Sequence, residues 1–444
     1  MSFASLPALP VELLESIVEY LGWDDVNPQD PHPFFNAARL KNLSHTCRSI
    51  LPVCRKYLFA TIKIRSSFIS ESRNLPALLK NSPELAGHTR HLYLQITRKP
   101  ERTEIPSEFK MFSRLKSYYI FFQEDYLRMY NYANIQPQTK ELLLHPIPTL
   151  TTFKLDNIAN FPFHELLRNF PNIRDLEISH ILIDASVEDY IPSGALPLKS
   201  LKLERFSSGE GSSDHAVVIQ KLFSIRQTDG QPLFDISRLK YLKLICADSS
   251  EWIKAQTTIL LQTSQLTTLI LMTNGTCTIN LSGILIGHSL LASRMTLKEI
   301  RIQNASTRSE YDRNPLHGLC EMLSILGKHH NVLESIFYRH FVYCRCDTGV
   351  EWEALDRVFD NHPWSRLRNL SIDIDTNIFI VPPDAPFDQQ LDPETETFKK
   401  YLEDVPQRLL PKLSTKSKED LDFHYEVHPN PTATYRNLVS TSFR

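Results

Sequence analysis

Two cysteines one residue apart are the first residues whose spacing suggests chemistry. Cys344 and Cys346 would point to the same side of a strand, and further cysteine and histidine side chains lie nearby in the sequence: Cys320, His329, His330 and His340. Zinc sites combine such ligands, but no second cysteine pair with a two-residue gap occurs here. Buried cysteines without a metal are therefore the expected interpretation, and we predict no metal site.

No other pattern nominates a catalytic group. The sequence contains no His-Glu-x-x-His, no Gly-x-Ser-x-Gly and no Gly-Lys-Ser/Thr arrangement. Gly209 and Gly211 precede an expected helix, but the third glycine of a dinucleotide-binding loop is absent. We therefore expect a protein that is not an enzyme and has no cofactor.

Composition narrows the possible partners and the compartment. A formal net charge of −2 over 444 residues gives no basic field, which argues against nucleic acid as the main partner. Seven dispersed cysteines indicate a reducing compartment rather than a disulfide framework. The first residues do not resemble a signal peptide, and there is no run of about twenty apolar residues. These observations predict a cytoplasmic or nuclear protein that does not bind a membrane.

One pattern recurs through most of the chain: an apolar residue, two others, an apolar residue, one other and a last apolar residue. Inside each unit the alternation is that of a strand with one buried face. Helical patterns such as Leu281 to Leu291 and Leu316 to Leu326 separate the units. The eight units follow one another at intervals of 23 to 41 residues and begin at Leu150, Ile173, Leu198, Leu239, Leu266, Leu297, Leu333 and Leu367.

Strand and helix units at this spacing are typical of a right-handed parallel coil. The pattern resembles that of the leucine-rich repeat family, in an irregular form with long insertions. The resemblance implies an α/β solenoid with parallel strands over residues 65–390. The alternative is an ordinary doubly wound domain, whose strands would be apolar on both faces. Most of these strands carry Lys, Glu or Arg between their last two apolar residues, which favours the solenoid.

The two ends of such an array need caps. Within residues 391–444 we expect a helix near Phe398 to Leu409 and a last strand over Leu421 to Val427, followed by a loose tail from His428. Residues 1–64 would form the cap at the other end.

The outward positions of the strands suggest where a substrate would bind. They are mostly charged in the earlier strands and more apolar in the later ones, as in a protein-binding groove. The alternative is that insertions or the tail cover these positions. The first candidates for a phosphate contact are Lys154, Lys202, Lys243 and Arg301, and the candidate residues for protein binding are Tyr241, Ile245, Ile270, Met272 and Phe337.

The sequence of residues 1–64 predicts a small helical unit with more apolar surface than it can bury itself. A first helix starts at Pro10 and runs to about Leu21, a second covers Phe34 to Cys47, and a third follows Ser49, which we expect to cap it. The unit ends in a strand near Ile64. The first helix carries two neighbouring apolar stripes, one of Leu14, Val18 and Leu21 and one of Leu9, Leu13, Ile17 and Tyr20. A unit this small can bury one stripe, so the other suggests a partner chain.

These residues resemble the F-box, in its fungal form. The resemblance covers about residues 6 to 60 and rests on a Leu-Pro start, the helix stripe and a Leu-Ser-x-x-Cys-Arg segment. It implies docking onto the Skp-type adaptor of a cullin-based ubiquitin ligase. The positions of this sequence that match the family's adaptor contact are Leu9, Pro10, Leu13, Leu14, Ile17, Leu43, Cys47 and Arg48.

The implied function is that of a substrate-recognition subunit. The first 64 residues would bind the adaptor and, through it, a cullin, while the repeats would hold an unknown protein substrate near the ubiquitin-carrying enzyme. The alternative is a leucine-rich-repeat scaffold that regulates another protein without ubiquitin transfer. In that case residues 1–64 would be a plain helical cap.

Overall fold

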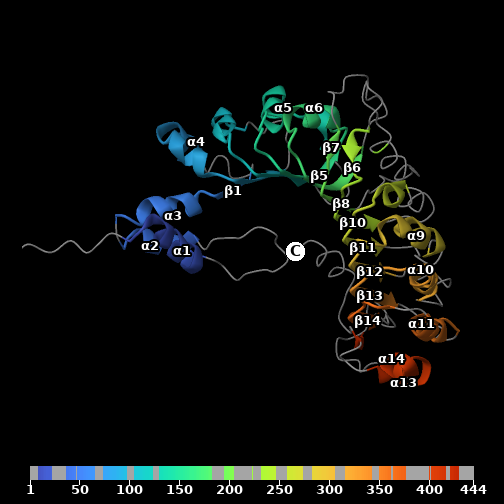
Figure 1. The fold of residues 1–444 in the computed structure, drawn as a ribbon. Helices are drawn as coiled ribbons and strands as arrows, with labels where there is room; N and C mark the ends of the chain where they lie inside the picture. Colours follow the sequence, from blue (N-terminus) through green and yellow to red (C-terminus); the bar gives the residue numbers. More distant parts are fainter. Residues whose placement is uncertain are drawn as a thin grey trace, which may run out of the picture. The chain divides into compact units, whose positions relative to one another are not determined.

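A computed structural model gives the fold of the chain in two compact units, Met1–Leu196 and Pro197–Arg444 (Figure 1). The division at 196 falls inside the predicted repeat region and was not expected from the sequence. The residues that the structure describes are 9–22, 37–46, 48–65, 74–97, 105–123, 130–182, 195–204, 223, 232–246, 258–273, 283–305, 316–342, 350–361, 364–376, 400, 402–416 and 421–429.

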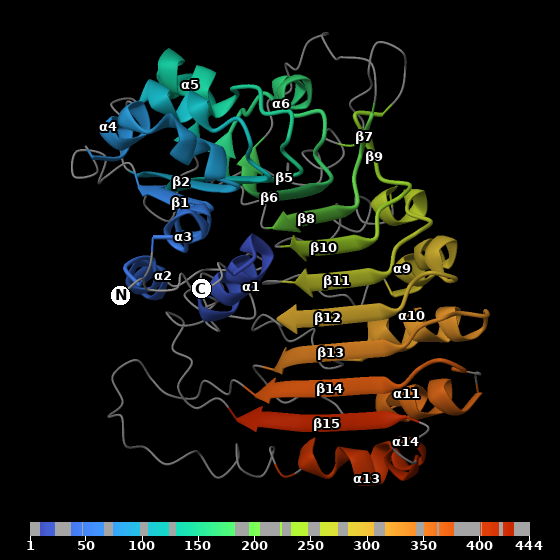
Figure 2. The same cartoon turned by 60° about the vertical axis from the view of Figure 1, so that its left-hand side comes forward.

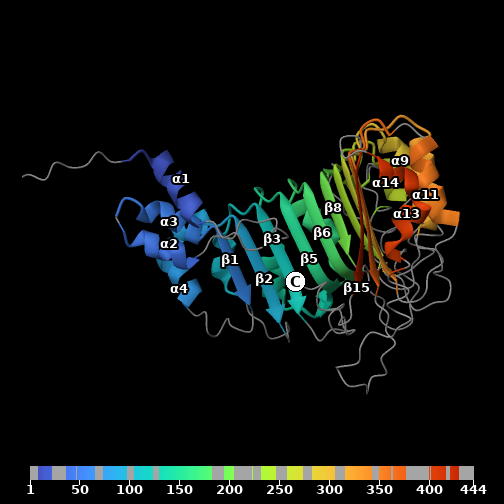
Figure 3. The ribbon, with the colours of Figure 1, turned by 90° about the horizontal axis from the view of Figure 1, so that it is seen from below.

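The first unit begins with three helices and continues as alternating strands and helical segments (Figure 3). The helices are α1 (Val11–Gly22), α2 (Ala37–Ser44), α3 (Leu51–Leu58), α4 (Asn74–Asn81), α5 (Pro137–Leu143) and α6 (Phe163–Asn169). The 3-10 helices are η2 (Pro83–His88), η4 (Ser107–Met111) and η5 (Tyr132–Asn134). The strands are β1 (Thr61–Arg65), β2 (His91–Thr97), β3 (Ser117–Gln123), β4 (Tyr130–Asn131), β5 (Thr152–Ala159) and β6 (Asp175–Leu182).

The strands of this unit pair in parallel, in the order β1-β2-β3-β5-β6, and β4 pairs with the end of β5. The register aligns the apolar positions of neighbouring strands, as between Leu94, Ile120 and Leu155. These side chains are buried. Helices α4, α5 and α6 lie along one side of the sheet (Figure 1). The other side carries the polar and aromatic positions and is only half-buried.

The second unit shows the same alternation, and the strands of its main sheet all point the same way (Figure 2). They pair in parallel in the order β8-β10-β11-β12-β13-β14-β15. The strands are β8 (Ser200–Glu204), β9 (Phe234–Asp235), β10 (Tyr241–Cys246), β11 (Thr268–Thr273), β12 (Glu299–Ala305), β13 (Ser335–Val342), β14 (Asn369–Thr376) and β15 (Asp422–Pro429). The helices are α9 (Gly283–Leu290), η7 (Leu291–Ser293), α10 (His317–Gly327), α11 (Val350–Asn361), α13 (Val405–Leu409) and α14 (Pro411–Thr415). The two-residue β9 pairs with β7 (Leu196–Pro197).

Each of the eight predicted repeats therefore coincides with a strand, because its alternating apolar residues are buried on one face of that strand. In unit 2 the first buried position of each strand lies opposite that of the next, as for Leu242, Leu269 and Ile300. The strand predicted over Leu421 to Val427 is β15, one residue later. The chain is thus α/β with parallel strands.

Two local predictions were wrong. Ser49 does not cap α3: the capping position is Ile50, whose side chain forms no cap hydrogen bond, and Pro52 stands in the first turn. The helix expected near Phe398 to Leu409 is interrupted within the described residues. Asp404 is in a turn, and a new helix, α13, begins at Val405 with Pro406 in its first turn; α14 follows.

Contacts of the buried side chains Asp356 and Trp352 hold α14 and β15 against α11. The Asp356 carboxylate on α11 is 5% exposed and accepts the backbone N–H of Leu413 at 2.9 Å, at the start of α14. The Tyr425 hydroxyl on β15 donates to the Leu402 carbonyl oxygen at 2.9 Å, and the Tyr425 ring meets the edge of the buried Trp352 ring. These contacts hold α14, Leu402 and β15 against one another and against α11.

Candidate functional site

The opening helix α1 has one buried and one exposed apolar face. Val18 is fully buried and Leu14 is half-buried, as the first stripe predicts, although Leu21 is exposed. On the other face Leu13 is 51% exposed and Ile17 38%, and Leu9, two residues before the helix begins, is 53% exposed. We call the four residues of the second stripe, Leu9, Leu13, Ile17 and Tyr20, the α1 ridge.

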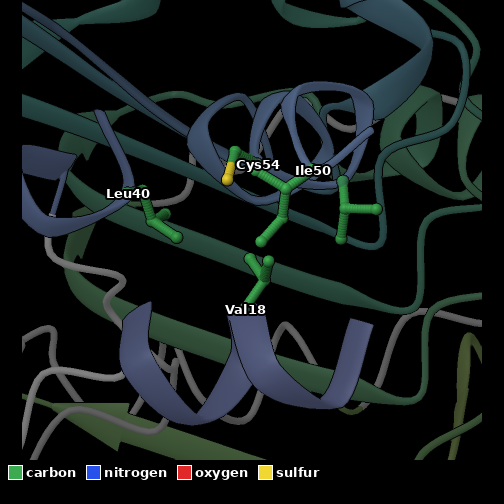
Figure 4. Close-up of a cluster of buried hydrophobic side chains, with 5 residues drawn as sticks. Val18, Leu40, Ile50 and Cys54 are labelled. Atoms are coloured by element: carbon green, nitrogen blue, oxygen red, sulfur yellow. The ribbon is translucent and has the colours of Figure 1, made fainter. Parts of the chain in front are cut away.

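Helices α1, α2 and α3 bury few apolar side chains, because the core that they share is small (Figure 4). The core consists of Val18 from α1, Leu40 from α2, and Ile50, Val53 and Cys54 at the start of α3. Partly buried residues pack around it: Leu14, Leu43, Tyr57 and Leu58. The α1 ridge is not among them. An ion pair of 2.7 Å between Lys56 and Glu15 also joins α3 to α1 at the surface.

The structure sorts the predicted adaptor residues into two groups. Leu9, Pro10, Leu13, Ile17 and Arg48 are exposed, while Leu14 and Leu43 face the small core. Cys47 lies outside the described residues. The exposed group is available to a partner, and the other group shapes the helices that carry it.

Three further apolar side chains of α1 are exposed that were not on the predicted list: Val11 at 55%, Tyr20 at 83% and Leu21 at 45%. Tyr20 belongs to the second stripe, so the periodicity already marked it. Leu21 belongs to the first stripe, but it lies in the last turn of α1, beyond the reach of the small core.

The candidate substrate residues of unit 2 lie on the face of the sheet opposite the buried rows. Ile270 and Phe337 occupy one row, with Arg301 of β12 between them. The Arg301 guanidinium lies 4.7 Å from the centre of the Phe337 ring, a cation–π contact. Tyr241 makes a similar contact at 5.7 Å with Lys202.

The next row along the strands contains Ile245 and Met272 side by side. Met272 is half-buried, but Ile245 is only 6% exposed and offers little surface to a ligand. The structure therefore leaves Tyr241, Ile270, Met272 and Phe337 accessible, each partly.

Carboxylates pair with three cations of this face, Lys243, Arg301 and Arg339. Lys243 pairs with Glu204 at 2.6 Å, and Arg301 pairs with Glu299. Arg339 forms two hydrogen bonds with the buried Asp375 carboxylate, at 2.5 and 3.1 Å. Hydrogen bonding to Asp375 raises the pKa of Arg339. A phosphate on a substrate would have to displace one of these carboxylates to reach Lys243 or Arg301.

The corresponding face of unit 1 has a row of alternating cations and aromatic rings. Lys63 lies 5.3 Å from the Tyr93 ring centre, Tyr93 meets Tyr119 edge to face at 5.6 Å, and Lys154 lies 5.6 Å from Tyr119. Lys154 also pairs with Glu177 at 3.0 Å. Lys154 therefore already has a carboxylate partner, as Lys243 and Arg301 do.

The zinc candidates do not form a metal-binding cluster in the part of the chain that the structure describes. Within the described ranges no three His, Cys, Asp or Glu residues are placed to hold a metal ion. Of the zinc candidates, Cys320 and His340 are buried, His329 and His330 are exposed, and Cys344 and Cys346 lie outside the described residues. Among the described helices none is long and apolar enough to cross a membrane.

Comparisons with known proteins do not identify a family for this chain. No family model matches the sequence, and no curated protein is similar enough to count as a relative.

Proposed function

We propose that this protein is the F-box substrate-recognition subunit of an SCF-type ubiquitin ligase. Residues 1–64 would be the F-box, residues 65–390 an irregular leucine-rich-repeat solenoid, and residues 391–444 its cap. The observation that carries the proposal is the exposed α1 ridge, on a helix whose sequence resembles the adaptor-binding motif.

The exposed apolar area of the α1 ridge favours binding of a partner protein that would cover it. Burying a leucine or isoleucine side chain completely is worth about 1.5–3 kcal/mol. Leu9 and Leu13 are about half exposed, so a partner that covered them would gain about 1 kcal/mol from each. Well-packed central residues of an interface contribute about 2 kcal/mol or more when truncated. A Skp-type adaptor that covers the ridge would thus gain much of its affinity from three or four side chains.

The repeat region would then hold the substrate. Such a subunit makes and breaks no bond itself; it raises the local concentration of the substrate near the ubiquitin-carrying enzyme. Tyr241, Ile270, Met272 and Phe337 are the candidate contacts for a protein surface. Because the charges around them are paired, we expect an apolar substrate segment to bind there.

Adaptor binding tests the proposal. A variant with Leu9→Asp, Leu13→Asp and Ile17→Asp is titrated with purified Skp-type adaptor, and we expect at least about a thirty-fold loss of affinity. The matched control is Leu78→Asp on α4, because Leu78 and Ile17 are both 38% exposed. The control should bind like the wild type. Unchanged affinity of the triple variant would refute the proposal.

The substrate face has its own test. Because Phe337 and Met272 are only partly buried, changing both to serine should weaken substrate capture while the melting temperature stays within a few degrees. Thermal unfolding of both proteins separates the two interpretations of this face. A large fall in stability would mean that these side chains are core packing, covered by other parts of the chain.

A further inference from the structure

A cavity of about 340 Å³ lies in unit 2, on the edge of the sheet where the last two strands begin. Its lining comes from the end of α11, from the described residues just before β14 and from Lys416 and Leu421. Figure 2 shows α11 and the starts of β14 and β15 near one another. Its volume is within the range of small-molecule sites. The lining residues are Phe359, Trp364, Ser365, Leu367, Arg368, Lys416 and Leu421.

The inner part of the cavity is apolar and fixed. Phe359, Leu367 and Leu421 are buried. The Trp364 ring lies 5.4 Å from the Phe359 ring, and its indole N–H donates to the Val358 carbonyl oxygen at 3.1 Å. Because this hydrogen bond holds the indole in place, the aromatic wall exists before any ligand arrives. A flat apolar group would fit against it.

The outer part consists of hydrogen-bond donors. Arg368, Lys416 and Ser365 are exposed, and none of the described lining residues is acidic. The Lys416 ammonium donates to the Phe359 carbonyl oxygen at 3.2 Å, which holds it at the cavity and leaves further N–H groups for a ligand. The Arg368 backbone is anchored by hydrogen bonds to the backbones of Glu334 and Asp422.

Two other lysines of this unit differ from Arg368 and Lys416, because carboxylates already neutralise them. Lys412 pairs with Asp360, and Lys298 pairs with Glu334. The Arg368 guanidinium forms no ion pair or side-chain hydrogen bond with any described residue. Two positive charges thus meet at an apolar cavity without a compensating carboxylate in its lining.

We propose that this cavity binds a phosphate monoester whose organic part is a small planar ring. A phosphate monoester carries a charge of about −1.5 to −2 at neutral pH, which matches one arginine and one lysine better than a carboxylate would. The guanidinium can bind two phosphate oxygens at once, and the ring would lie against Trp364 and Phe359. This site is separate from the α1 ridge and does not depend on adaptor binding.

The test measures the binding of phenyl phosphate to the full chain by calorimetry and by tryptophan fluorescence. We expect phenyl phosphate to bind at least about ten-fold more tightly than inorganic phosphate, which lacks the ring, or benzoate, which has a single charge. Equal affinity for phenyl phosphate and inorganic phosphate would overturn the proposal, since the apolar wall would then contribute nothing.

Matched variants locate the site. Arg368→Gln and Lys416→Gln should each weaken phenyl phosphate binding by about ten-fold or more, because each removes a charge-assisted hydrogen bond. Arg366→Gln is the control: Arg366 is also exposed and lies two residues away, but it does not line the cavity. Circular dichroism checks that all three fold. Equal binding by Arg368→Gln and Arg366→Gln would overturn the proposal.

A last comparison identifies the source of the ligand. Phosphotyrosine blocked at both ends carries the same ring and phosphate as phenyl phosphate. If it binds at least as tightly, a modified protein segment supplies the ligand, whereas weaker binding by about ten-fold assigns the cavity to a free small molecule. Failure of both probes to bind would overturn the proposal and leave the adaptor role untouched.

Discussion

The buried histidine of β13 makes a prediction about pH that can be worked out from its surroundings. His340 is 1% exposed, its ring stacks on the Tyr338 ring, and its Nδ1 lies 3.2 Å from the Tyr338 hydroxyl. Burial disfavours the charged imidazolium and lowers the pKa of His340 to about 3. The folded protein therefore keeps this ring neutral at every pH above that value.

The unfolded chain behaves differently, because a histidine in water has a pKa of about 6.5. Between pH 6.5 and about 3 the unfolded state binds a proton that the folded state does not. The free energy of unfolding must then fall as the pH falls, by up to about 1.4 kcal/mol per pH unit from this group alone. From pH 7 to pH 5 the loss amounts to about 2 kcal/mol.

His340→Gln removes this dependence, because glutamine does not titrate and its amide oxygen can accept a hydrogen bond from Tyr338. We expect the variant to lose about 2 kcal/mol less than the wild type between pH 7 and pH 5, in urea unfolding of unit 2 followed by tryptophan fluorescence. The control is His329→Gln, since His329 is exposed. Parallel stability curves for wild type and His340→Gln would refute the reasoning.

Two further variants test how unit 2 is packed. Asp356→Ala removes the carboxylate that accepts backbone N–H groups of α14 and should cost about 1–2 kcal/mol in urea unfolding, whereas Asp360→Ala, at an exposed ion pair, should cost less than about 1 kcal/mol. Equal losses would contradict this. Gly283→Ala would place a Cβ 2.1 Å from a carbonyl oxygen of α10 and should lower the stability by about 1–3 kcal/mol, while Gly87→Ala has free space and should stay within about 1 kcal/mol. If Gly283→Ala proves as stable as wild type, α9 and α10 are not packed as closely as described.

The strands could be predicted because their signal is local. In the repeat that starts at Leu239, the alternation of apolar and polar residues alone predicts which face of the strand is buried. The neighbouring strands have the same alternation and pair with it in register. The two faces of α1 could be predicted for the same reason. The exact start of a helix is harder to predict. Ser49 has a side chain suited to capping, but the capping position of α3 is the next residue, Ile50.

Contacts between distant segments could not be predicted. Lys243 was a candidate for phosphate binding, yet Glu204 from the preceding strand neutralises it, and only the register of β8 and β10 brings the two together. Ile245 was expected on an open face and is buried. The cavity at Arg368 is the clearest case, since its lining comes from three segments and no motif connects them.

The central claim is that α1 is the surface through which this protein docks onto a Skp-type adaptor. Hydrogen–deuterium exchange measures this directly, by comparing peptides that cover residues 9–22 with and without saturating purified adaptor. We predict slower exchange in these residues and no change in 83–97, which belong to η2 and β2. Exchange that stays the same in residues 9–22 would contradict the claim.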